Sequence, residues 1–556
     1  MRFGVFNLSH GRERLCQILM RIKRDAKILE VGSKERRVGA LSFHLIVIFV
    51  CIGAFFFSVW QGQYTVDPHH WGLMLSNAKD LSTGKLPYKE IFIQYGILPT
   101  LIHRYAFEEL GRDLISLISV TALFYSVALY CIFRMSLGVL KNQWTALICV
   151  LLTYLFHPVT MSPWANYIAS PFLFGGLLLS LRHSRVSLTF LGGILFGFAV
   201  LCREGLLLPL TAIILFFGII DKLSGRDENW MKSTVVRLSG VFLPAVFFFI
   251  YLLNNKLLEY WKIQNFDFPR LFAKQFFPAS HSVLVSLLIN ATRNAIQALK
   301  FWDGRWILLM FAPMACLLIL ISSLKCLRTR SGTKEIYDME NTKLAFASLV
   351  FLSTVLHGVE VFRFATASAV GFIPLVAWFN QKRLQIVVYI MILWMAFSAF
   401  GPNSGNYYFP SKNSLQLKLM KDTISETRRQ KWPAENQHYY LRLRQMLESP
   451  FLKNCEVNYQ YNMTKDSLFA VITPFTQLQL APFFVGESIE SLRPDKRLNQ
   501  KRDEAKDLVI LREVKSGDKQ TIPEGYFVWE ELKRPQAHFF EGEGVVQVLA
   551  PLKCRQ

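Results

Sequence analysis

Residues 64–111 read YTVDPHHWGLMLSNAKDLSTGKLPYKEIFIQYGILPTLIHRYAFEELG, and the interpretation of the whole chain starts from this stretch. It follows directly on a strongly apolar run at 42–60, so it begins at a membrane surface. It is dense in charged and imidazole side chains, and several Gly and Pro residues interrupt its helical pattern. A bilayer would exclude such a segment, and a linker would not need His, Tyr and Trp in this number. The stretch therefore predicts a polar loop beside a membrane that contains a functional site.

The composition indicates a multi-pass membrane protein. The chain has 556 residues, of which 52% are hydrophobic and 18% charged. Several apolar runs approach the ~20 residues that a helix needs to cross a bilayer. A net charge of +22 would favour nucleic acid as the partner of a soluble protein. Here the basic residues gather at predicted cytoplasmic helix ends and near anionic head groups, so no nucleic-acid partner is expected.

The distribution of Lys and Arg predicts the orientation in the membrane. Residues 1–41 are rich in both and are expected to form a cytoplasmic N-terminus. A transmembrane domain of about eleven helices follows over 42–401. The expected helices are 42–60, 114–133, 144–157, 164–181, 186–202, 205–221, 235–253, 305–324, 342–357, 361–379 and 384–400. The odd number places loop 61–112 and the C-terminal region 402–556 on the same, outer side.

The composition changes at about residue 402, where charges of both signs appear. Turn signals separate short β-like segments at Leu508–Leu511, Tyr526–Trp529 and Val545–Leu549, which predicts a small soluble α/β domain over 402–556. Most of the nine cysteines lie in apolar runs, without zinc-site spacing. Cys455 and Cys554 lie in the polar region instead. A disulfide between these two is possible if the domain is outside the cytoplasm.

A cytoplasmic N-terminus, one helix and a long outer loop that opens with Asp67 resemble the GT-C superfamily of membrane glycosyltransferases, including its mannosyl- and arabinosyltransferases. The residues that carry the resemblance are Asp67, the phrase GKLPYKEIFIQYG at 84–96 and the amphipathic stretch at 97–111. Bacterial members typically read G–x–x–P–Y–x–D/E followed by Y–G–P. This chain has Glu90 in the acidic place and Ile97 where Pro is usual. The resemblance covers roughly residues 40–400.

The resemblance implies transfer of a hexosyl or pentosyl group from a polyprenyl-phosphate donor to an acceptor hydroxyl, with inversion. It implies an outer-face site, no cofactor, and a lipid or glycan acceptor rather than a protein. A bacterial inner membrane is the expected location. Because an acceptor hydroxyl needs a base, Asp67 is the candidate general base, although it also suits the N-cap of a helix with Pro68 at its first position. Glu90 is either a second acid or a solvated charge.

The other candidates each have two interpretations. His69 and His70 are expected to face phosphate; a divalent metal with Asp67 is the less favoured interpretation, because neighbouring helical side chains point to different sides. Tyr88 and Tyr95 either stack on sugar or anchor the loop at the interface. Candidate phosphate-binding groups at outer helix ends are Arg203, Glu204, His357, Glu360 and Arg363. The alternative is that these residues pair only with one another. The basic outer loop 254–304 either lines the phosphate site or lies on anionic lipid.

Two other classes of protein share the expected lipid. A transporter or other lipid-handling protein without chemistry would carry charges near the bilayer midplane and paired broken helices. A polysaccharide polymerase or ligase would carry its key arginines on one very large outer loop. Candidate charges that concentrate at outer helix ends favour the glycosyltransferase.

Overall fold

The computed structural model describes residues 42–64, 66–156, 163–181, 185–224, 229–270, 304–329, 339–354, 369–400, 416–419, 424–477, 507–514, 522–535 and 544–555, together with single positions between 270 and 304. The chain divides into two compact units, Met1–Gly53 and Ala54–Gln556. The described part of the first unit is the beginning of the helix Ser42–Gln61. The contacts that build the fold and the site described below all lie within the second unit.

Long apolar helices make up most of the described chain, as expected for an integral membrane protein. Four of them are long and apolar enough to cross a membrane: Ser42–Gln61, α4 (Leu114–Leu140), the run Glu204–Leu223 that contains α8 (Leu207–Leu223), and α9 (Trp230–Asn254). The remaining apolar helices are α5 (Gln143–Leu155), α6 (Ala165–Leu181), α7 (Val186–Cys202), α13 (Gly304–Thr329), α14 (Met339–Ser353), α16 (Phe372–Gln381) and α17 (Gln385–Phe400). Each of the eleven ranges expected from the sequence overlaps one of these helices. That all eleven cross the membrane stays a prediction.

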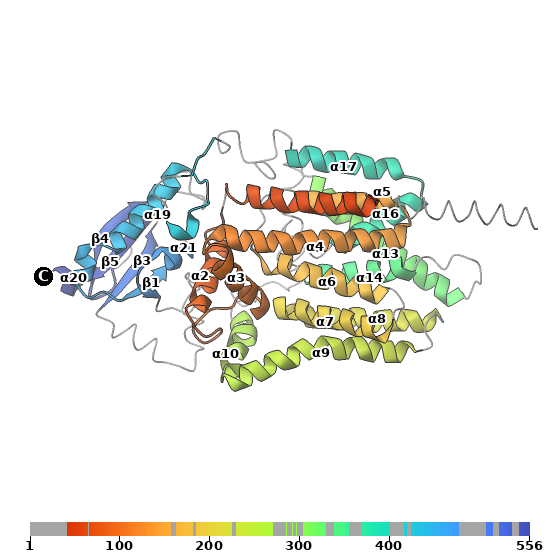
Figure 1. Cartoon of the computed structure of the whole chain (residues 1–556), viewed down its shortest axis with the longest axis horizontal. Coiled ribbons are helices and arrows are strands. Elements are labelled where there is room, and N and C mark those ends of the chain that lie inside the picture. The colour runs from red at the N-terminus through yellow and green to blue at the C-terminus, as the bar shows by residue number, and fades with distance from the viewer. Residues whose placement is uncertain are drawn as a thin grey trace, which may run out of the picture. The chain divides into compact units, whose positions relative to one another are not determined.

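The helices α4, α6, α7 and α9 run side by side (Figure 1). Their facing sides are apolar and closely packed, whereas side chains such as Phe247 on α9 are exposed, as on a lipid-facing surface. One ion pair is buried in this region: Lys343 on α14 and Asp221 on α8 are each 2% exposed, and their Nζ and Oδ1 atoms lie 2.5 Å apart. Asp221 lies near the end of its helix that is expected to be cytoplasmic.

The polar loop folds into two short helices, α2 (His70–Ser82) and α3 (Ile97–Leu110), which pack against each other. Asp113 then caps α4, because its Oδ1 accepts hydrogen bonds from the Ser116 backbone N–H at 3.0 Å and the Ser116 hydroxyl at 2.9 Å. Most of α2 is buried, from Trp71 to Ala78. The loop predicted from the sequence is therefore a packed structural layer at the end of the helices, rather than an open connection.

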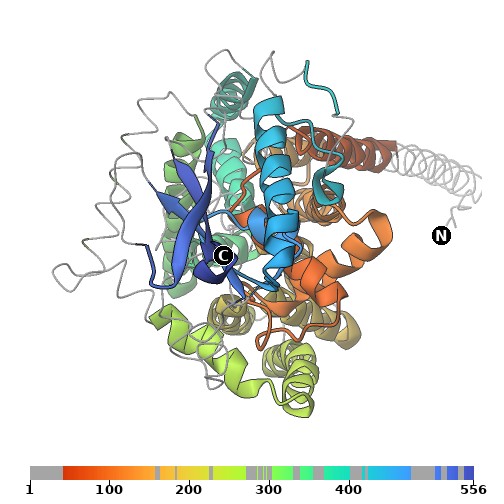
Figure 2. The same ribbon diagram turned by 90° about the vertical axis from the view of Figure 1, so that its left-hand side faces the viewer.

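The C-terminal region is a small domain of helices and a five-stranded mixed sheet (Figure 2). Its elements are α19 (Ala434–Leu447), α20 (Pro450–Asn454), β1 (Tyr459–Met463), α21 (Leu468–Ile472), β2 (Thr476–Gln477), β3 (Leu508–Val514), β4 (Tyr526–Lys533), β5 (Val545–Pro551) and the 3-10 turn η5 (Leu552–Arg555). The strand order is β2-β1-β3-β5-β4, with β1 parallel to β2 and β3, and β5 antiparallel to β3 and β4. The three strands expected from the sequence are confirmed as β3, β4 and β5.

This domain is docked on the polar loop through α2. The backbone N–H of Ser467 donates to the Pro68 carbonyl at 3.2 Å, and α21 packs on α2. A glycine at position 72 makes this approach possible, because a Cβ there would lie 2.7 Å from the backbone nitrogen of Leu468. Lys79 adds an ion pair, with its Nζ donating to Glu426 Oε1 at 2.8 Å. The domain and the loop therefore lie on the same side of the membrane.

Candidate active site

Asp67 is placed at the entrance to α2 by its own hydrogen bonds. Its Oδ1 accepts from the backbone N–H of His69 at 2.9 Å and of His70 at 3.1 Å. Its carbonyl accepts from the N–H of Trp71 at 2.9 Å. These contacts satisfy amide groups that the first turn of a helix leaves without intrahelical partners. The capping role that the sequence indicated for Asp67 is therefore present.

The second oxygen of Asp67 is held by His70. The Nδ1 atom of His70 lies 2.6 Å from Asp67 Oδ2, and the two side chains are 28% and 41% exposed respectively. Burial opposes ionisation of Asp67, but the hydrogen bond and the charge of His70 outweigh burial and hold the pKa of Asp67 below its usual value. The two side chains form a carboxylate–imidazole pair that is open to solvent on one side, hereafter the Asp67–His70 dyad.

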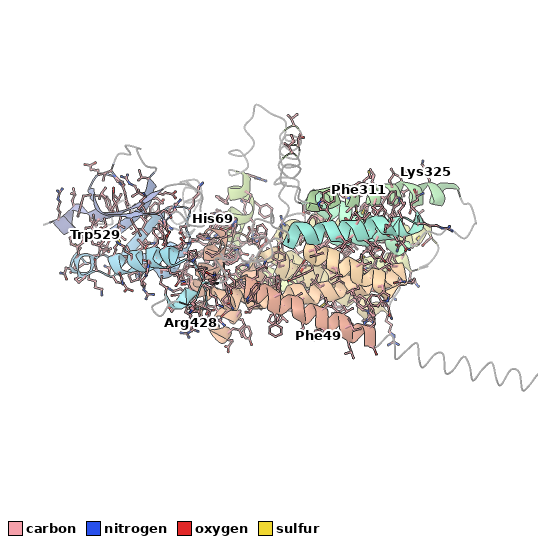
Figure 3. All side chains as sticks on the ribbon, turned by 90° about the horizontal axis from the view of Figure 1, so that it is seen from above. Phe49, His69, Phe311, Lys325, Arg428 and Trp529 are labelled. Carbon is pink, nitrogen blue, oxygen red and sulfur yellow. The ribbon has the colours of Figure 1, made fainter. Side chains whose placement is uncertain are left out.

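His69 contacts the C-terminal domain and lies where that domain meets the helices (Figure 3). Its Nδ1 lies 3.0 Å from the carbonyl oxygen of Lys465. Because a carbonyl only accepts hydrogen bonds, Nδ1 carries the proton in this contact. Burial, and then the neighbouring His70, lower the pKa of His69, so its imidazole is neutral at pH 7. A loop of the C-terminal domain thus forms one wall of the site.

Aromatic side chains form the other wall. The ring of Trp164, which precedes α6, packs edge-on against His70 with 5.8 Å between centroids. Its indole N–H donates to the hydroxyl of Tyr95 at 2.8 Å. Tyr95 therefore contacts the dyad through Trp164. Its side chain is half-buried, which is compatible with either of its two predicted roles.

Next to Tyr95, the polar loop meets the C-terminal end of α7. The N–H of Gly96 donates to the carbonyl of Cys202 at 3.0 Å, and a Cβ at position 96 would lie only 2.0 Å from the Leu201 carbonyl oxygen. Beyond this junction, Arg203 Nη1 donates to Asn166 Oδ1 at 3.0 Å. Arg203 and Asn166 line a crevice of about 20 Å³, enough for one water molecule. The Asn166 segment also carries Trp164, so Arg203 and the dyad face the same short stretch of chain.

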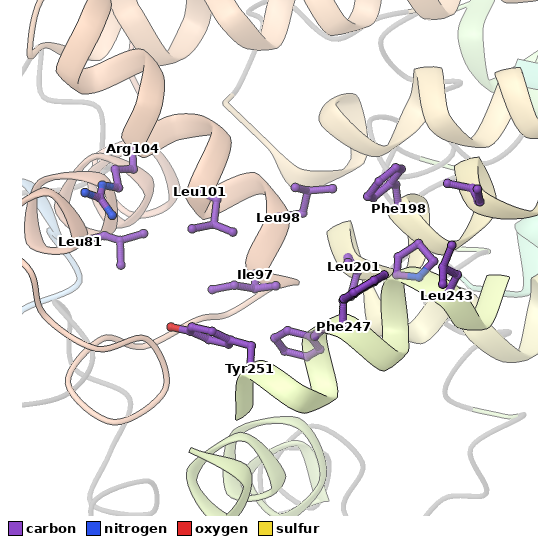
Figure 4. Close-up of a pocket in the computed structure, with 13 residues that line it drawn as sticks. Leu81, Ile97, Leu98, Leu101, Arg104, Phe198, Leu201, Leu243, Phe247 and Tyr251 are labelled. Atoms are coloured by element: carbon purple, nitrogen blue, oxygen red, sulfur yellow. The ribbon is translucent and has the colours of Figure 1, made fainter. Parts of the chain in front are cut away.

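On the other side of the junction lies an apolar groove of about 520 Å³ between α3, α7 and α9 (Figure 4). Its lining is almost entirely hydrocarbon and includes Leu98, Leu101, Phe198, Leu201, Phe247 and Tyr251. Arg104 lies at the same end of the groove as Leu81 and Tyr251, and its Nε donates to Glu108 at 2.9 Å. Leu201 lines the groove two residues before Arg203, so the groove and the polar crevice lie on either side of the Gly96–Cys202 contact.

Tyr88 and Glu204 lie apart from the dyad, in the contact between the loop and α10 (Leu258–Lys262). Tyr88 is 0% exposed, has φ 66°, and packs in an apolar cluster with Leu252 and Leu257. Glu204 faces the Tyr88 hydroxyl and the indole of Trp261. The Tyr88 side chain is buried in the packing of the loop against α10, and both of its predicted roles stay predictions.

A one-turn π-helix, η2 (Ile263–Asp267), holds the same loop from the other side. Gln264 in this turn donates from Nε2 to the Tyr88 carbonyl at 2.6 Å and accepts from the Ile93 N–H at 2.9 Å. Single π-turns often occur where a helix must reposition a side chain. Glu90 is exposed and its Oε2 accepts from the Leu86 N–H at 2.7 Å. Within the described chain Glu90 makes no contact with Asp67, so its solvated interpretation fits this structure.

Several predicted residues lie outside the described chain. His357, Glu360 and Arg363 follow Thr354, which lines the Arg203 crevice, but residues 355–368 are not described. Of loop 254–304, the described basic residues Lys256, Lys262 and Arg270 are exposed. Among the residues that the structure describes, no group of three His, Cys, Asp or Glu side chains could hold a metal ion.

The two cysteines of the C-terminal domain are neighbours. Both are free thiols in this structure. Burial, and then a hydrogen bond with Cys455, raise the pKa of Cys554 to about 12. The helix α20, which ends next to Cys455, also contacts η5, which carries Cys554. The disulfide stays a prediction.

Three residues of the site were not among the sequence candidates: Trp164, Asn166 and Lys465. The first two had a signal, since a Trp and an Asn begin an apolar helix that follows a predicted outer loop. Lys465 had none, because it contributes a backbone carbonyl from a domain more than 390 positions away along the chain.

No family model matches the sequence, and no curated protein matches it. Among solved structures, the chain is similar to the oligosaccharyltransferase of Archaeoglobus fulgidus in complex with Zn and sulfate (TM-score 0.48, 14% identity, 85% of this chain and 68% of that chain). It is also similar to ArnT from Cupriavidus metallidurans bound to undecaprenyl phosphate (TM-score 0.43, 10% identity, 91% and 97%) and in the apo state (0.40, 11%, 92% and 98%). All three TM-scores lie below 0.5, and the likeness assigns neither an activity nor a substrate to this chain.

Proposed function

We propose that this protein is a membrane glycosyltransferase that moves a sugar from a polyprenyl-phosphate donor to an acceptor hydroxyl on the outer face of the membrane. The observation that carries the proposal is the position of the apolar groove. It lies among membrane helices and passes the Gly96–Cys202 junction, on the other side of which are a crevice with an arginine and a solvent-open carboxylate–imidazole dyad. A lipid-linked phosphosugar needs these three environments next to one another.

The groove suits the prenyl chain of the donor. Burying apolar surface contributes about 25 cal/mol per Å², so a long isoprenoid chain gains most of its affinity from such a lining. The phosphate is assigned to Arg203, whose guanidinium is able to fork onto two oxygens. Arg104 lines the groove itself and pairs with Glu108. The untested candidates His357, Glu360 and Arg363 belong to this phosphate end in the proposal.

The dyad supplies the acid–base chemistry. The acceptor hydroxyl must lose a proton as its oxygen attacks the anomeric carbon, and the departing phosphate must be stabilised as negative charge develops. Asp67 is the carboxylate of the base assembly, and Tyr95 and Trp164 offer aromatic surface to a sugar. With the base and the phosphate on opposite faces of the ring, the transfer inverts the anomeric configuration. The proposed acceptor is a lipid or a glycan.

The proposal is tested by sugar transfer in proteoliposomes with a panel of radiolabelled polyprenyl-phosphate sugars. The wild type transfers from at least one donor, and Asp67→Asn loses about 10²-fold or more of kcat. Leu98→Trp fills the groove and raises the KM for the donor several-fold with little change in kcat. Leu123→Trp on α4, a 51% exposed position outside the groove, is the matched control and leaves both constants unchanged. A donor KM that is equal in both Trp variants contradicts the groove assignment.

A second candidate is a lipid-linked glycan transporter without chemistry. The buried Lys343–Asp221 pair is the observation in its favour, because ionisable residues inside a membrane bundle often mark transport pathways. In the same proteoliposomes, movement of labelled lipid across the bilayer without sugar transfer would establish the transporter. Lys343→Met together with Asp221→Leu would then abolish the movement, whereas it leaves a transferase active.

A further inference from the structure

We propose that the atom that takes the acceptor proton is Nε2 of His70, and that Asp67 acts by orienting this imidazole. The inference rests on the proposed transferase function and deepens it. It replaces a single carboxylate base, the role expected for Asp67 from the sequence, by a two-residue assembly.

The hydrogen bonds of Asp67 make its carboxylate a poor base. Oδ1 already accepts two backbone N–H groups and Oδ2 accepts the imidazole at 2.6 Å. Proton transfer to Asp67 would break or weaken these bonds at the entrance to α2. The same bonds favour the anion and lower the pKa of Asp67, and a base whose pKa lies far below the working pH takes protons inefficiently.

The geometry of His70 assigns its tautomer. An ionised carboxylate only accepts, so Nδ1 of His70 is the donor in the 2.6 Å contact. The neutral ring then carries its lone pair on Nε2. Nε2 makes no hydrogen bond to any residue in the described part of the chain, and the His70 side chain is 28% exposed. Trp164 packs edge-on against the ring and limits its rotation.

His69 is not the same kind of group. Its Nδ1 is directed to the Lys465 carbonyl, whereas Nδ1 of His70 is directed to the Asp67 carboxylate. The backbone N–H of His69 donates to Asp67 Oδ1, and its Nδ1 donates to the Lys465 carbonyl. These two bonds fix the backbone next to His70. His69 is therefore a positioning residue, and it offers a control for the adjacent His70.

The step balances as follows. The acceptor O–H proton moves to Nε2 while the acceptor oxygen forms a bond to the anomeric carbon. The bond from that carbon to the donor phosphate oxygen breaks, and its electron pair leaves with the polyprenyl phosphate. The imidazolium that forms is stabilised by the Asp67 carboxylate, and it later returns its proton to water.

The decisive variant is His70→Asn. The amide nitrogen of Asn takes the place of Nδ1, so the bond to Asp67 and the cap of α2 are retained while the base at Nε2 is lost. We expect kcat to fall by about 10²-fold or more, with the donor KM unchanged. The same substitution at the neighbour, His69→Asn, is the matched control and costs less than about tenfold in kcat. His70→Ala regains activity when imidazole is added to the buffer.

The Asp67 variants complete the test. If Asp67 orients His70, the double variant Asp67→Asn/His70→Asn is no slower than His70→Asn alone, because the two residues act as a unit. Near-wild-type kcat in His70→Asn, with Asp67→Asn inactive and no imidazole rescue, overturns the assignment and leaves the transferase standing. A wild type that transfers from no donor overturns the proposed function and this inference together.

Discussion

Asp466 is a buried carboxyl group that the site depends on indirectly. It is 2% exposed, its Oδ2 accepts the Tyr440 hydroxyl at 2.7 Å, and its Oδ1 accepts the Leu468 N–H at 2.9 Å. Burial raises the pKa of Asp466 to about 7, against the lowering effects of Tyr440, Leu468 and Arg534 and with a further rise from Glu513. The residue sits in the turn whose Lys465 carbonyl meets His69, so its protonation state bears on the wall of the site.

This raised pKa predicts how stability depends on pH. The folded chain keeps the proton on Asp466 up to about pH 7, whereas the unfolded chain releases it near the ordinary value of 3.8. The stabilisation of the folded state by protonated Asp466 is therefore fully present below about pH 4. It falls by roughly 3–5 kcal/mol at most as the pH rises to about 7. Asp466→Asn removes this slope. Thermal unfolding of the full chain in detergent between pH 4 and 8 measures it as the difference from wild type.

Glu435→Gln is the matched control, since Glu435 is exposed on α19 in the same domain. We expect the thermal unfolding of Glu435→Gln to depend on pH as that of the wild type does. Equal slopes for wild type and Asp466→Asn would show that Asp466 is ionised in the folded protein across this range.

At the level of elements, α2 is held from both directions. Its first turn carries His70 of the dyad and contacts the Ser467–Leu468 turn at Gly72, and Lys79 near its end donates to Glu426 and to the Val471 carbonyl at 2.6 Å. Lys79 also keeps the pKa of Glu426 low against the effect of burial. The C-terminal domain therefore belongs to the site structurally, through one helix.

Replacing Lys79 is expected to loosen this docking. Lys79→Met leaves the 9% exposed Glu426 without its 2.8 Å partner, at a cost of about 1–3 kcal/mol. Lys85 provides a close control: its side chain is 32% exposed against 33% for Lys79, but it pairs only with Asp80 inside the loop. Hydrogen exchange is measured in residues 424–477. Faster exchange in Lys79→Met and not in Lys85→Met supports the docking; equal exchange in both contradicts it.

At the level of the whole molecule, the docking fixes which segments share one side of the membrane. The polar loop and the C-terminal domain are in contact, so they cannot be separated by the bilayer. The turn at Lys382, between α16 and α17, belongs to the opposite side if the predicted orientation is right.

Sidedness is measured with a membrane-impermeant maleimide on intact cells. In a chain with Cys455→Ser, we expect Thr83→Cys on the polar loop and Glu435→Cys in the C-terminal domain to be labelled. Lys382→Cys is labelled only after the membrane is opened. Labelling of Lys382→Cys in intact cells would reverse the predicted orientation, and opposite results for Thr83→Cys and Glu435→Cys would contradict the docked structure.

The sequence predicted the elements better than their contacts. Apolar run length and flanking charge locate the helices, and short alternating segments locate β3, β4 and β5, because these signals are local. Local chemistry also placed Asp67 at the cap of α2. The contact of His70 with Trp164, the Lys465 carbonyl beside His69 and the burial of Tyr88 depend on segments distant in sequence, so no spacing rule contains them. The burial of Tyr88 and the exposure of Glu90 likewise could not be read from the local pattern.

The helix α2 also has a consequence for how this protein tolerates change. It is 13 residues long, about 20 Å, with the dyad at its first turn and the groove residue Leu81 in its last. Inserting one residue between Gly72 and Lys79 would rotate one end against the other by about 100° and shift it by about 1.5 Å. Such an insertion would move the dyad relative to Leu81 without altering any side chain at either end. We therefore expect insertions and deletions in α2 to be tolerated as poorly as substitutions of His70.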